Sequence, residues 1–277
     1  MKNFLLPFLL LVACCSRVGM PAALGAMPQI INVSAYDPKE KQRSGTGFSE
    51  HNVSALRANG ASALIARAGK GGILDEKCHH FLASADCVGM LPGVYYRLQN
   101  HVDAVRQADQ FVARAQSLAR GRQWNAPALL LCGDFDAKSR LSDIIRFMDR
   151  VESRTGVVPV AYLENSAHLK SLLSRADAAA KAKIRRMPYW LALYSTDYVA
   201  GPRELLKQYD VWSHWTMWQY GGVDWERGRS QAKVYSGGPY RFSRYFGNMD
   251  RPLERNVFNG SQGSLQAFWK RHGMRLR

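Results

Sequence analysis

The sequence predicts an α/β fold, a single barrel-like domain of alternating strands and helices. Short apolar runs alternate with amphipathic segments through the region after residue 26, which is the pattern of serial β-α units. With 277 residues and 47% apolar content, the chain can bury one large core without a second domain. One apolar run, residues 127–136, ends in two acids, as a buried strand does where it reaches a functional edge.

Seven segments have the length and apolar content of buried strands. They are residues 30–34, 63–67, 93–96, 128–134, 158–163, 190–194 and 217–220. Helices are expected between them, and serial units of this kind favour a barrel or a doubly wound sheet. In both architectures, functional side chains lie at the carboxyl ends of the strands.

Two helices are marked by apolar stripes at helical spacing. The first covers residues 101–119 and stops at Gly121, and the second covers residues 141–154 and stops at Gly156. Residues 221–251 are rich in Gly, Arg, Tyr and Ser without a period. We expect this stretch to form a long loop or lid.

The first 26 residues are predicted to be an export signal, so that the folded domain covers residues 27–277. One lysine precedes an apolar block that is too short to span a bilayer. Residues 11–14 resemble a bacterial lipobox, which would leave Cys14 lipidated; alternatively, the small residues 23–25 allow ordinary cleavage near Ala26. The protein is therefore expected to be exported, and to be periplasmic, lipid-anchored or secreted.

Cysteine spacing and net charge indicate which covalent links, ligands and partners the protein could have. Export would allow a disulfide between Cys78 and Cys87, whereas Cys132 lies in an apolar run as a buried thiol. No Cys/His spacing suggests zinc, so no metal and no cofactor are expected. The net charge of +16 suggests an anionic partner. Nucleic acid, anionic membrane and anionic cell wall all qualify, but no nucleic-acid motif accompanies the charge.

Asp134 and Asp136 are the strongest candidates for chemistry. Side chains two residues apart on a strand share a face, so both carboxylates would point beyond the end of the strand 128–134. A hydrolase that must protonate a leaving oxygen and stabilise positive charge needs such a pair. The alternative is a helix N-cap at Asp136 with a solvated neighbour.

Aromatic residues crowd the segment 190–220. They either fill the core or line a saccharide cleft: Trp190, Tyr194, Trp212, Trp215, Trp218 and Tyr220. Tyr95 and Tyr162 lie at strand ends, and they too would either pack in the core or contact a substrate. His214 is read as a hydrogen-bonded histidine rather than a base, and Asp37 and Asp224 as turn acids.

Several segments in order resemble glycoside hydrolase family 25, the Chalaropsis-type lysozymes. Residues 31–36 (INVSAY) are similar to the opening Asp-Val-Ser strand of that family, and residues 92–96 (PGVYY) to its Gly-x-Tyr-His strand, followed by a helix with Gln107, Ala108 and Phe111. Residues 131–136 occupy the place of its Asp-x-Glu. Further similarities lie at 155–162 (TGVVPVAY), 188–194 (PYWLALY), 218–220 (WQY) and 254–261 (ERNVFNGS). The resemblance covers residues 30–270.

The resemblance implies a barrel that cleaves the β-1,4 bond between N-acetylmuramic acid and N-acetylglucosamine in peptidoglycan, with the sugar's acetamido oxygen as nucleophile. It implies a general acid at Asp136, and a carboxylate at Asp134 that orients the acetamido group or stabilises positive charge. Asn32 and Glu254 would be supporting polar groups. Of the family's acid positions, Asp134 keeps the residue type, whereas Asn32, Asp136 and Glu254 depart from it.

The resemblance also implies which residues and partners meet at the site. Substrate contacts are expected from Tyr95, Tyr162, Trp190, Trp218 and Gln219. The expected partners are peptidoglycan glycan strands and anionic cell-wall polymer, with membrane contact through a possible lipid anchor and a monomeric chain. Because three acid positions have changed, the alternative is a catalytically degenerate peptidoglycan-binding protein on the same fold. A hydrolase of another amino-sugar polymer is more distant.

Overall fold

A computed structural model of the chain describes residues 27–35, 50–194, 201–226, 229–237, 240–243, 246 and 253–276. The predicted export signal and Asp37 lie outside the described residues. Among the described helices, none has the length and apolar character needed to cross a membrane.

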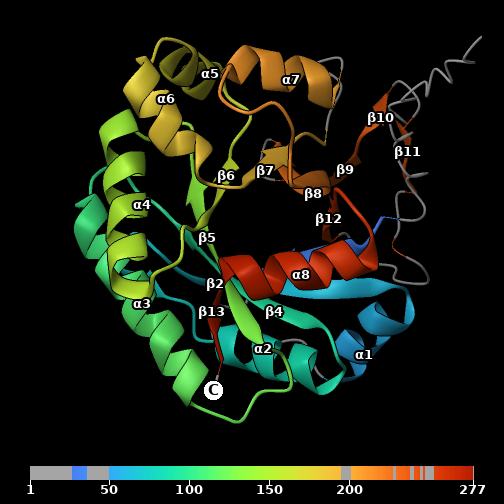
Figure 1. Cartoon of the computed structure of the whole chain (residues 1–277). Coiled ribbons are helices and arrows are strands. Elements are labelled where there is room, and N and C mark those ends of the chain that lie inside the picture. The colour runs from blue at the N-terminus through green and yellow to red at the C-terminus, as the bar shows by residue number, and fades with distance from the viewer. Residues whose placement is uncertain are drawn as a thin grey trace, which may run out of the picture.

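Eight strands close into a barrel, which confirms the predicted α/β barrel (Figure 1). They are β1 (Gln29–Val33), β2 (Ala61–Lys70), β4 (Leu91–Arg97), β5 (Ala128–Phe135), β6 (Val160–Leu163), β7 (Tyr189–Ala192), β8 (Met217–Glu226) and β12 (Glu254–Phe258). Neighbours pair in the order β1-β2-β4-β5-β6-β7-β8-β12, and β12 pairs with β1 to complete the ring. The seven predicted strands correspond to all of these except β12.

Strand β12 runs antiparallel to the other seven strands of the ring. It is antiparallel to both of its neighbours, β1 and β8, whereas the remaining pairs in the ring are parallel. The first residue of β12 therefore lies at the carboxyl ends of the parallel strands. The register places Glu254 opposite Asn32, so two residues far apart in the sequence meet at this end of the barrel.

Five further strands lie outside the ring. Strands β3 (Ile73–Leu74), β9 (Arg229–Val234) and β13 (Gly273–Arg275) pair with β2, β8 and β5, whereas β10 (Ser236–Gly237) and β11 (Tyr240–Arg241) pair with each other in a separate two-stranded sheet. The prediction of a long loop over residues 221–251 is wrong for its first part, because β8 continues to Glu226 and forms a hairpin with β9. The backbone of Asp224 belongs to this hairpin, so it is not a turn acid.

Eight helices of the described chain cover the barrel. They are α1 (Glu50–Ala58), α2 (Cys78–Cys87), α3 (Ala104–Arg120), α4 (Leu141–Thr155), α5 (Ala167–Ser174), α6 (Ala178–Arg185), α7 (Pro202–Tyr209) and α8 (Gln262–His272). Both predicted helices are present, as α3 and α4. The Asp103 carboxylate caps α3, and α4 ends where Gly156 adopts a positive φ of 72°. Helix α8 crosses one end of the barrel (Figure 1).

Alternation along the strands separates an inner from an outer core. In β5, Leu130 and Cys132 point into the barrel, whereas Leu129 and Leu131 pack against the surrounding helices. Trp269 of α8 joins the inner core, and its indole N–H donates to the Pro92 carbonyl at 2.7 Å. Because Pro92 lies near the start of β4, α8 closes the amino-terminal end and leaves the carboxyl ends of the strands open.

The disulfide that export would allow between Cys78 and Cys87 is not formed. Cys78 and Cys87 are the first and last residues of α2, and both are free thiols. Nine residues of helix separate their Cα atoms by roughly 13 Å, about twice the span that a disulfide bridges. Cys132 is a buried free thiol, as predicted.

Candidate active site

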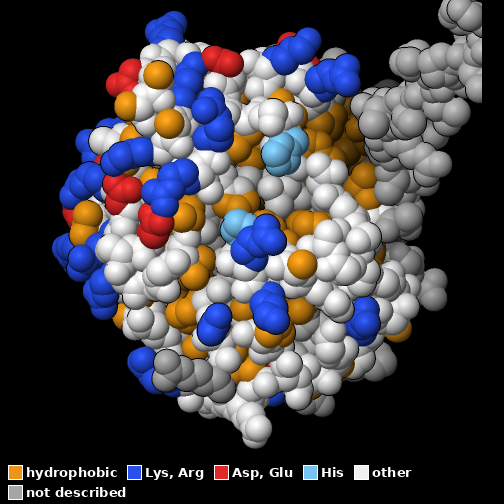
Figure 2. All heavy atoms as spheres, viewed as in Figure 1, with side chains coloured by type: hydrophobic (Ala, Val, Ile, Leu, Met, Phe, Trp, Pro, Cys, Tyr) orange, Lys and Arg blue, Asp and Glu red, His pale blue; other side chains and the backbone are white. Residues whose placement is uncertain are grey.

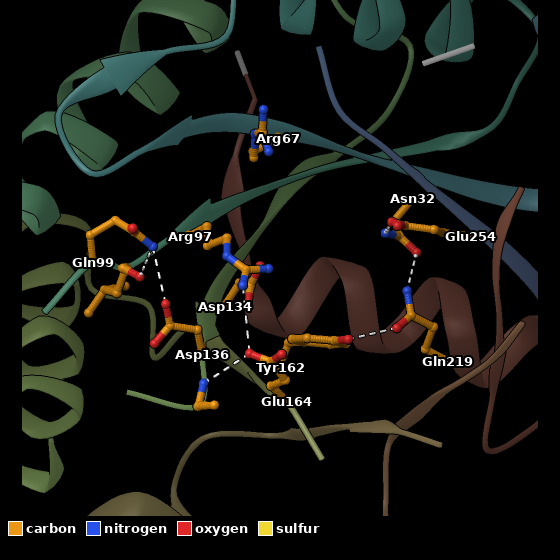
Figure 3. A network of polar contacts seen from close by, with 12 residues as sticks. Asn32, Arg67, Arg97, Gln99, Asp134, Asp136, Tyr162, Glu164, Gln219 and Glu254 are labelled. Carbon is orange, nitrogen blue, oxygen red and sulfur yellow. Dashed lines mark hydrogen bonds and ion pairs between the residues drawn. The ribbon is translucent and has the colours of Figure 1, made fainter. Parts of the chain in front are cut away.

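A pocket of about 350 Å³ opens at the carboxyl ends of the barrel strands. Polar side chains from all sides of the barrel converge on it (Figure 3). Its lining consists of Asn32, Ser34, Arg67, Lys70, Tyr95, Arg97, Asp134, Tyr162, Glu164, Trp190, Tyr194, Gln219, Gly222 and Glu254. The predicted location at this end of the barrel is therefore where the structure has a pocket.

Asp134 reaches the pocket because it continues the inward row of β5, after Leu130 and Cys132. Its side chain is 8% exposed, and Oδ2 lies 3.8 Å from Nη1 of Arg97. The other oxygen, Oδ1, is buried without a hydrogen bond from a described residue. Burial raises the pKa of Asp134 to about 7, although the Arg97 guanidinium opposes the rise. Asp134 thus holds a proton at mildly acidic pH.

Asp136 does not share the pocket with Asp134, contrary to the prediction. Strand β5 ends at Phe135, and the chain then turns, so the alternation of a strand no longer applies. One oxygen of Asp136 accepts from the Lys138 backbone N–H at 2.9 Å. The other accepts from Nε2 of Gln99 at 3.2 Å (Figure 3). Asp136 therefore stabilises a turn beside the pocket instead of lining it.

Asn32 and Glu254 form the opposite wall of the pocket. The Asn32 amide donates to the Glu254 carboxylate, across the β1–β12 pair. Oδ1 of Asn32 accepts from Nδ2 of Asn256 at 2.8 Å and from Nε2 of Gln219 at 3.3 Å. The amide at position 32 thus permits a direct bond to Glu254 that two ionised carboxylates could not make.

Aromatic residues form part of the pocket wall. Tyr95, Tyr162 and Trp190 line it, and the Tyr162 hydroxyl donates to Oε1 of Gln219 at 2.7 Å. The rings of Tyr162 and Trp190 meet edge to face, 5.1 Å between centroids. This part of the wall therefore combines aromatic rings with hydrogen-bonding groups held by neighbouring side chains.

Trp218 faces the opposite way, so its predicted contact with substrate is wrong. It is fully buried among the helix-facing residues, and its indole N–H donates to the Leu193 carbonyl at 2.8 Å. Neighbouring residues on a strand point to opposite faces. Because Gln219 faces the pocket, Trp218 must pack outside the barrel.

The sequence analysis missed four charged groups of the pocket: Arg67, Lys70, Arg97 and Glu164. Arg97 and Glu164 directly follow the predicted strands 93–96 and 158–163, and Asp134 stands likewise at the end of its predicted strand. The signal that drew attention to Asp134 was thus present at both positions. His214 lies elsewhere, exposed, with its Nδ1 3.0 Å from the Ser213 hydroxyl; this agrees with a hydrogen-bonded histidine.

Charged groups of both signs line the pocket. Arg97 contacts the carboxyl groups of Asp134 and Glu164, whereas Arg67 is paired with Asp75 at 2.8 Å. Within the described part of the chain, no group of three His, Cys, Asp or Glu residues could hold a metal ion. A buried carboxyl with a raised pKa beside further carboxylates can act as a proton donor in acid-assisted cleavage.

Comparison with known proteins agrees with this architecture. The structure resembles a bacterial lysozyme from Streptomyces coelicolor (TM-score 0.57, 19% identity, covering 88% of this chain and 97% of that one). It also resembles a muramidase from Acremonium alcalophilum (0.56, 16%, 88% and 99%) and a GH25 lysozyme from Aspergillus fumigatus (0.54, 17%, 88% and 99%). No curated protein matches the sequence. The sequence model of glycosyl hydrolases family 25 matches residues 44–228, more than half of the chain, and the chain therefore belongs to the glycosyl hydrolases of family 25.

Proposed function

We propose that this chain is an exported N-acetylmuramidase that hydrolyses the β-1,4 bond between N-acetylmuramic acid and N-acetylglucosamine in peptidoglycan. Membership of family 25 supports glycoside hydrolysis, and similar folds carry the names lysozyme and muramidase. The observation that carries the proposal is the buried Asp134 carboxyl, which lines the pocket with an unbonded oxygen and a pKa of about 7.

In this proposal Asp134 is the proton donor, the role that sequence resemblance had given to Asp136. The proton passes from Asp134 to the leaving glycosidic oxygen as the bond to the anomeric carbon breaks. The acetamido oxygen of the muramic acid residue attacks that carbon and forms a cyclic oxazolinium ion. Water then adds to the anomeric carbon and returns a proton to Asp134, so the enzyme is regenerated.

The remaining pocket residues would bind the sugars. Tyr95 and Trp190 form a largely buried apolar floor, and the hydrogen-bonded set of Asn32, Gln219 and Tyr162 offers fixed polar groups. Such preorganised groups lower the cost of ordering a bound substrate. Glu254, bonded to Asn32, would accept from a sugar hydroxyl.

A second surface supports anionic wall polymer as a partner. A groove of about 930 Å³ lies at the amino-terminal end of the barrel, opposite the pocket. Figure 2 views this end, where basic and histidine side chains surround apolar ones. Its lining includes Arg185, Arg186, Arg203 and Lys207; Arg186 is paired with Glu152, and the acid of the groove, Asp210, is paired with Lys181 at 2.6 Å. We propose that this groove holds the enzyme on the anionic polymer of the wall.

The test separates an enzyme from a binding protein. Purified chain and its Asp134→Asn variant are incubated with peptidoglycan, and released muropeptides and sedimented protein are measured together. Release by the wild type that is lost in the variant is the expected result. Sedimentation with the wall but no release by the wild type would refute hydrolysis and leave a degenerate peptidoglycan-binding protein.

A further inference from the structure

Glu164 brings a second carboxylate to the pocket from the strand next to β5. It directly follows β6, and its backbone N–H donates to the Phe135 carbonyl at 3.1 Å, so it is fixed at the carboxyl end of the β5–β6 pair. The side chain lines the pocket and is 43% exposed. The backbone of Glu164 is therefore fixed while its carboxylate is accessible from the pocket, unlike the buried carboxyl of Asp134.

The contacts of Glu164 leave one of its oxygens available. Oε2 accepts from the Ala137 backbone N–H at 2.9 Å and lies 3.6 Å from Nη2 of Arg97 (Figure 3). No hydrogen bond from a described residue engages Oε1. The carboxylate is thus oriented through one oxygen, and the other is free to meet a ligand in the pocket.

Arg97 ties Glu164 to the proposed proton donor. Its Nη1 lies 3.8 Å from Asp134 and its Nη2 lies 3.6 Å from Glu164. One guanidinium therefore contacts both carboxyl groups through separate nitrogens. Their surroundings differ, because Asp134 is buried whereas Glu164 faces solvent. When two neighbouring carboxyl groups lie in different surroundings, one can act as the proton donor while the other acts as the anion.

Glu164 also lies beside the end of β5, where the sequence analysis had expected Asp136 to line the pocket. Its carboxylate bonds the N–H of Ala137, the residue that follows Asp136. The turn directs Asp136 toward Gln99 and Lys138, away from the pocket lining. An acid from β6 thus occupies the pocket beside the end of β5, where an acid from β5 was expected.

We propose that Glu164 is the second catalytic carboxylate of this enzyme. As the anion, it accepts the N–H of the substrate's acetamido group and offsets the positive charge that develops at the anomeric carbon and in the oxazolinium ring. No proton moves to or from Glu164; the proton that cleaves the bond comes from Asp134. This inference rests on the proposed muramidase function and adds a residue to it.

The competing role for Glu164 is structural, as an anchor for the turn after β5. Glu164→Gln separates the two roles, because the glutamine oxygen can still accept from Ala137 while the charge is lost. Glu164→Asp retains the charge with a shorter reach. Glu204→Gln, on the exposed start of α7, is the matched control for the same chemical change away from the pocket.

The experiment measures kcat/KM against pH for each variant on two substrates. One is peptidoglycan; the other is a 2,4-dinitrophenyl glycoside of the N-acetylglucosamine–N-acetylmuramic acid disaccharide, whose leaving group needs no proton. Glu164→Gln is expected to lose about a hundredfold or more on both substrates. Asp134→Asn is expected to lose activity on peptidoglycan but retain most of it on the aryl glycoside. Glu204→Gln should match the wild type.

The pH profile provides a readout that a structural anchor would not change. The titratable and charged groups that interact with Asp134 are Arg97 of β4, Glu164 and Tyr162 from β6, Glu254 of β12 and, from outside the pocket, Asp136 after β5. The negative charge of Glu164 raises the pKa of Asp134. Glu164→Gln should therefore move the alkaline limb of kcat/KM to lower pH, whereas Glu164→Asp should leave it near the wild-type position and recover part of the rate.

The experiment distinguishes failure of the inference about Glu164 from failure of the muramidase proposal itself. If Glu164→Gln keeps activity within a few-fold of wild type with an unmoved alkaline limb, Glu164 is not catalytic and the muramidase proposal stands. If the wild type cleaves neither substrate, both proposals fail. Should Glu164→Gln be unfolded by circular dichroism, a Glu164→Asp variant that folds but is inactive, or that has a shifted limb, would contradict the charge-based role.

Discussion

The buried carboxyl of Asp134 makes a quantitative prediction about stability. Its pKa is raised from 3.8 to about 7 in the folded chain, chiefly by burial, so the folded state binds this proton more tightly than the unfolded state does. The contribution of Asp134 to stability is therefore fully present below about pH 4 and is lost as pH rises to about 7. At 1.36 kcal/mol for each pKa unit, the loss is about 4 kcal/mol.

Asp134→Asn removes this titration while keeping the size of the side chain. The free energy of unfolding of the variant, minus that of the wild type, should rise by about 4 kcal/mol between about pH 4 and pH 8. Urea denaturation of both proteins, followed by circular dichroism across this range, measures the difference. A difference that stays constant with pH would refute the argument, because it would mean that Asp134 ionises normally in the folded chain.

Three further predictions concern other parts of the molecule. Asn32→Asp places a second carboxylate against its hydrogen-bonded partner and should lower stability by about 1–3 kcal/mol at neutral pH but less at about pH 4, measured by denaturation at both pH values. Gly133→Ala should lower stability by about 1–3 kcal/mol in thermal unfolding, since the added Cβ would lie 2.8 Å from the Phe135 ring; an unchanged Tm would contradict this packing. Arg203→Ala with Lys207→Ala should reduce sedimentation with walls that carry anionic polymer, but not cleavage of a soluble glycan; equal loss on polymer-free walls would exclude the groove as the polymer site.

Strand and helix patterns in the sequence predicted most of the barrel. Seven buried strands and the two long helices α3 and α4 were correctly placed, because burial imposes apolar runs and helical periodicity. Strand β12 was not identified as a strand, since its five residues, Glu254–Phe258, begin with three polar side chains and have apolar ones only at the last two positions. The β8–β9 hairpin was missed because its residues carry few apolar side chains.

The location of the site was predicted from the sequence, but some of the residues that line the pocket were not. Asp134, Asn32, Glu254, Tyr95, Tyr162, Trp190 and Gln219 all line the pocket. Trp218 does not, although the alternation of a strand already excludes Trp218 and Gln219 from one face. Asp136 could not be judged from sequence, because the alternation rule holds only as far as the strand continues, and β5 ends one residue before it. The position of Glu164 directly after a predicted strand was visible in the sequence, but its place beside Asp134 depends on the pairing of β5 with β6, which the sequence does not specify.

Digestion of peptidoglycan in ¹⁸O-labelled water tests the central claim most directly. The enzyme is incubated with purified peptidoglycan, and the reducing ends of the soluble products are identified by mass spectrometry. A muramidase that works through Asp134 should place one ¹⁸O atom on reducing N-acetylmuramic acid ends, and Asp134→Asn should produce none above background. Reducing N-acetylglucosamine ends, anhydro-muramic acid ends, or unchanged product from Asp134→Asn would contradict the account.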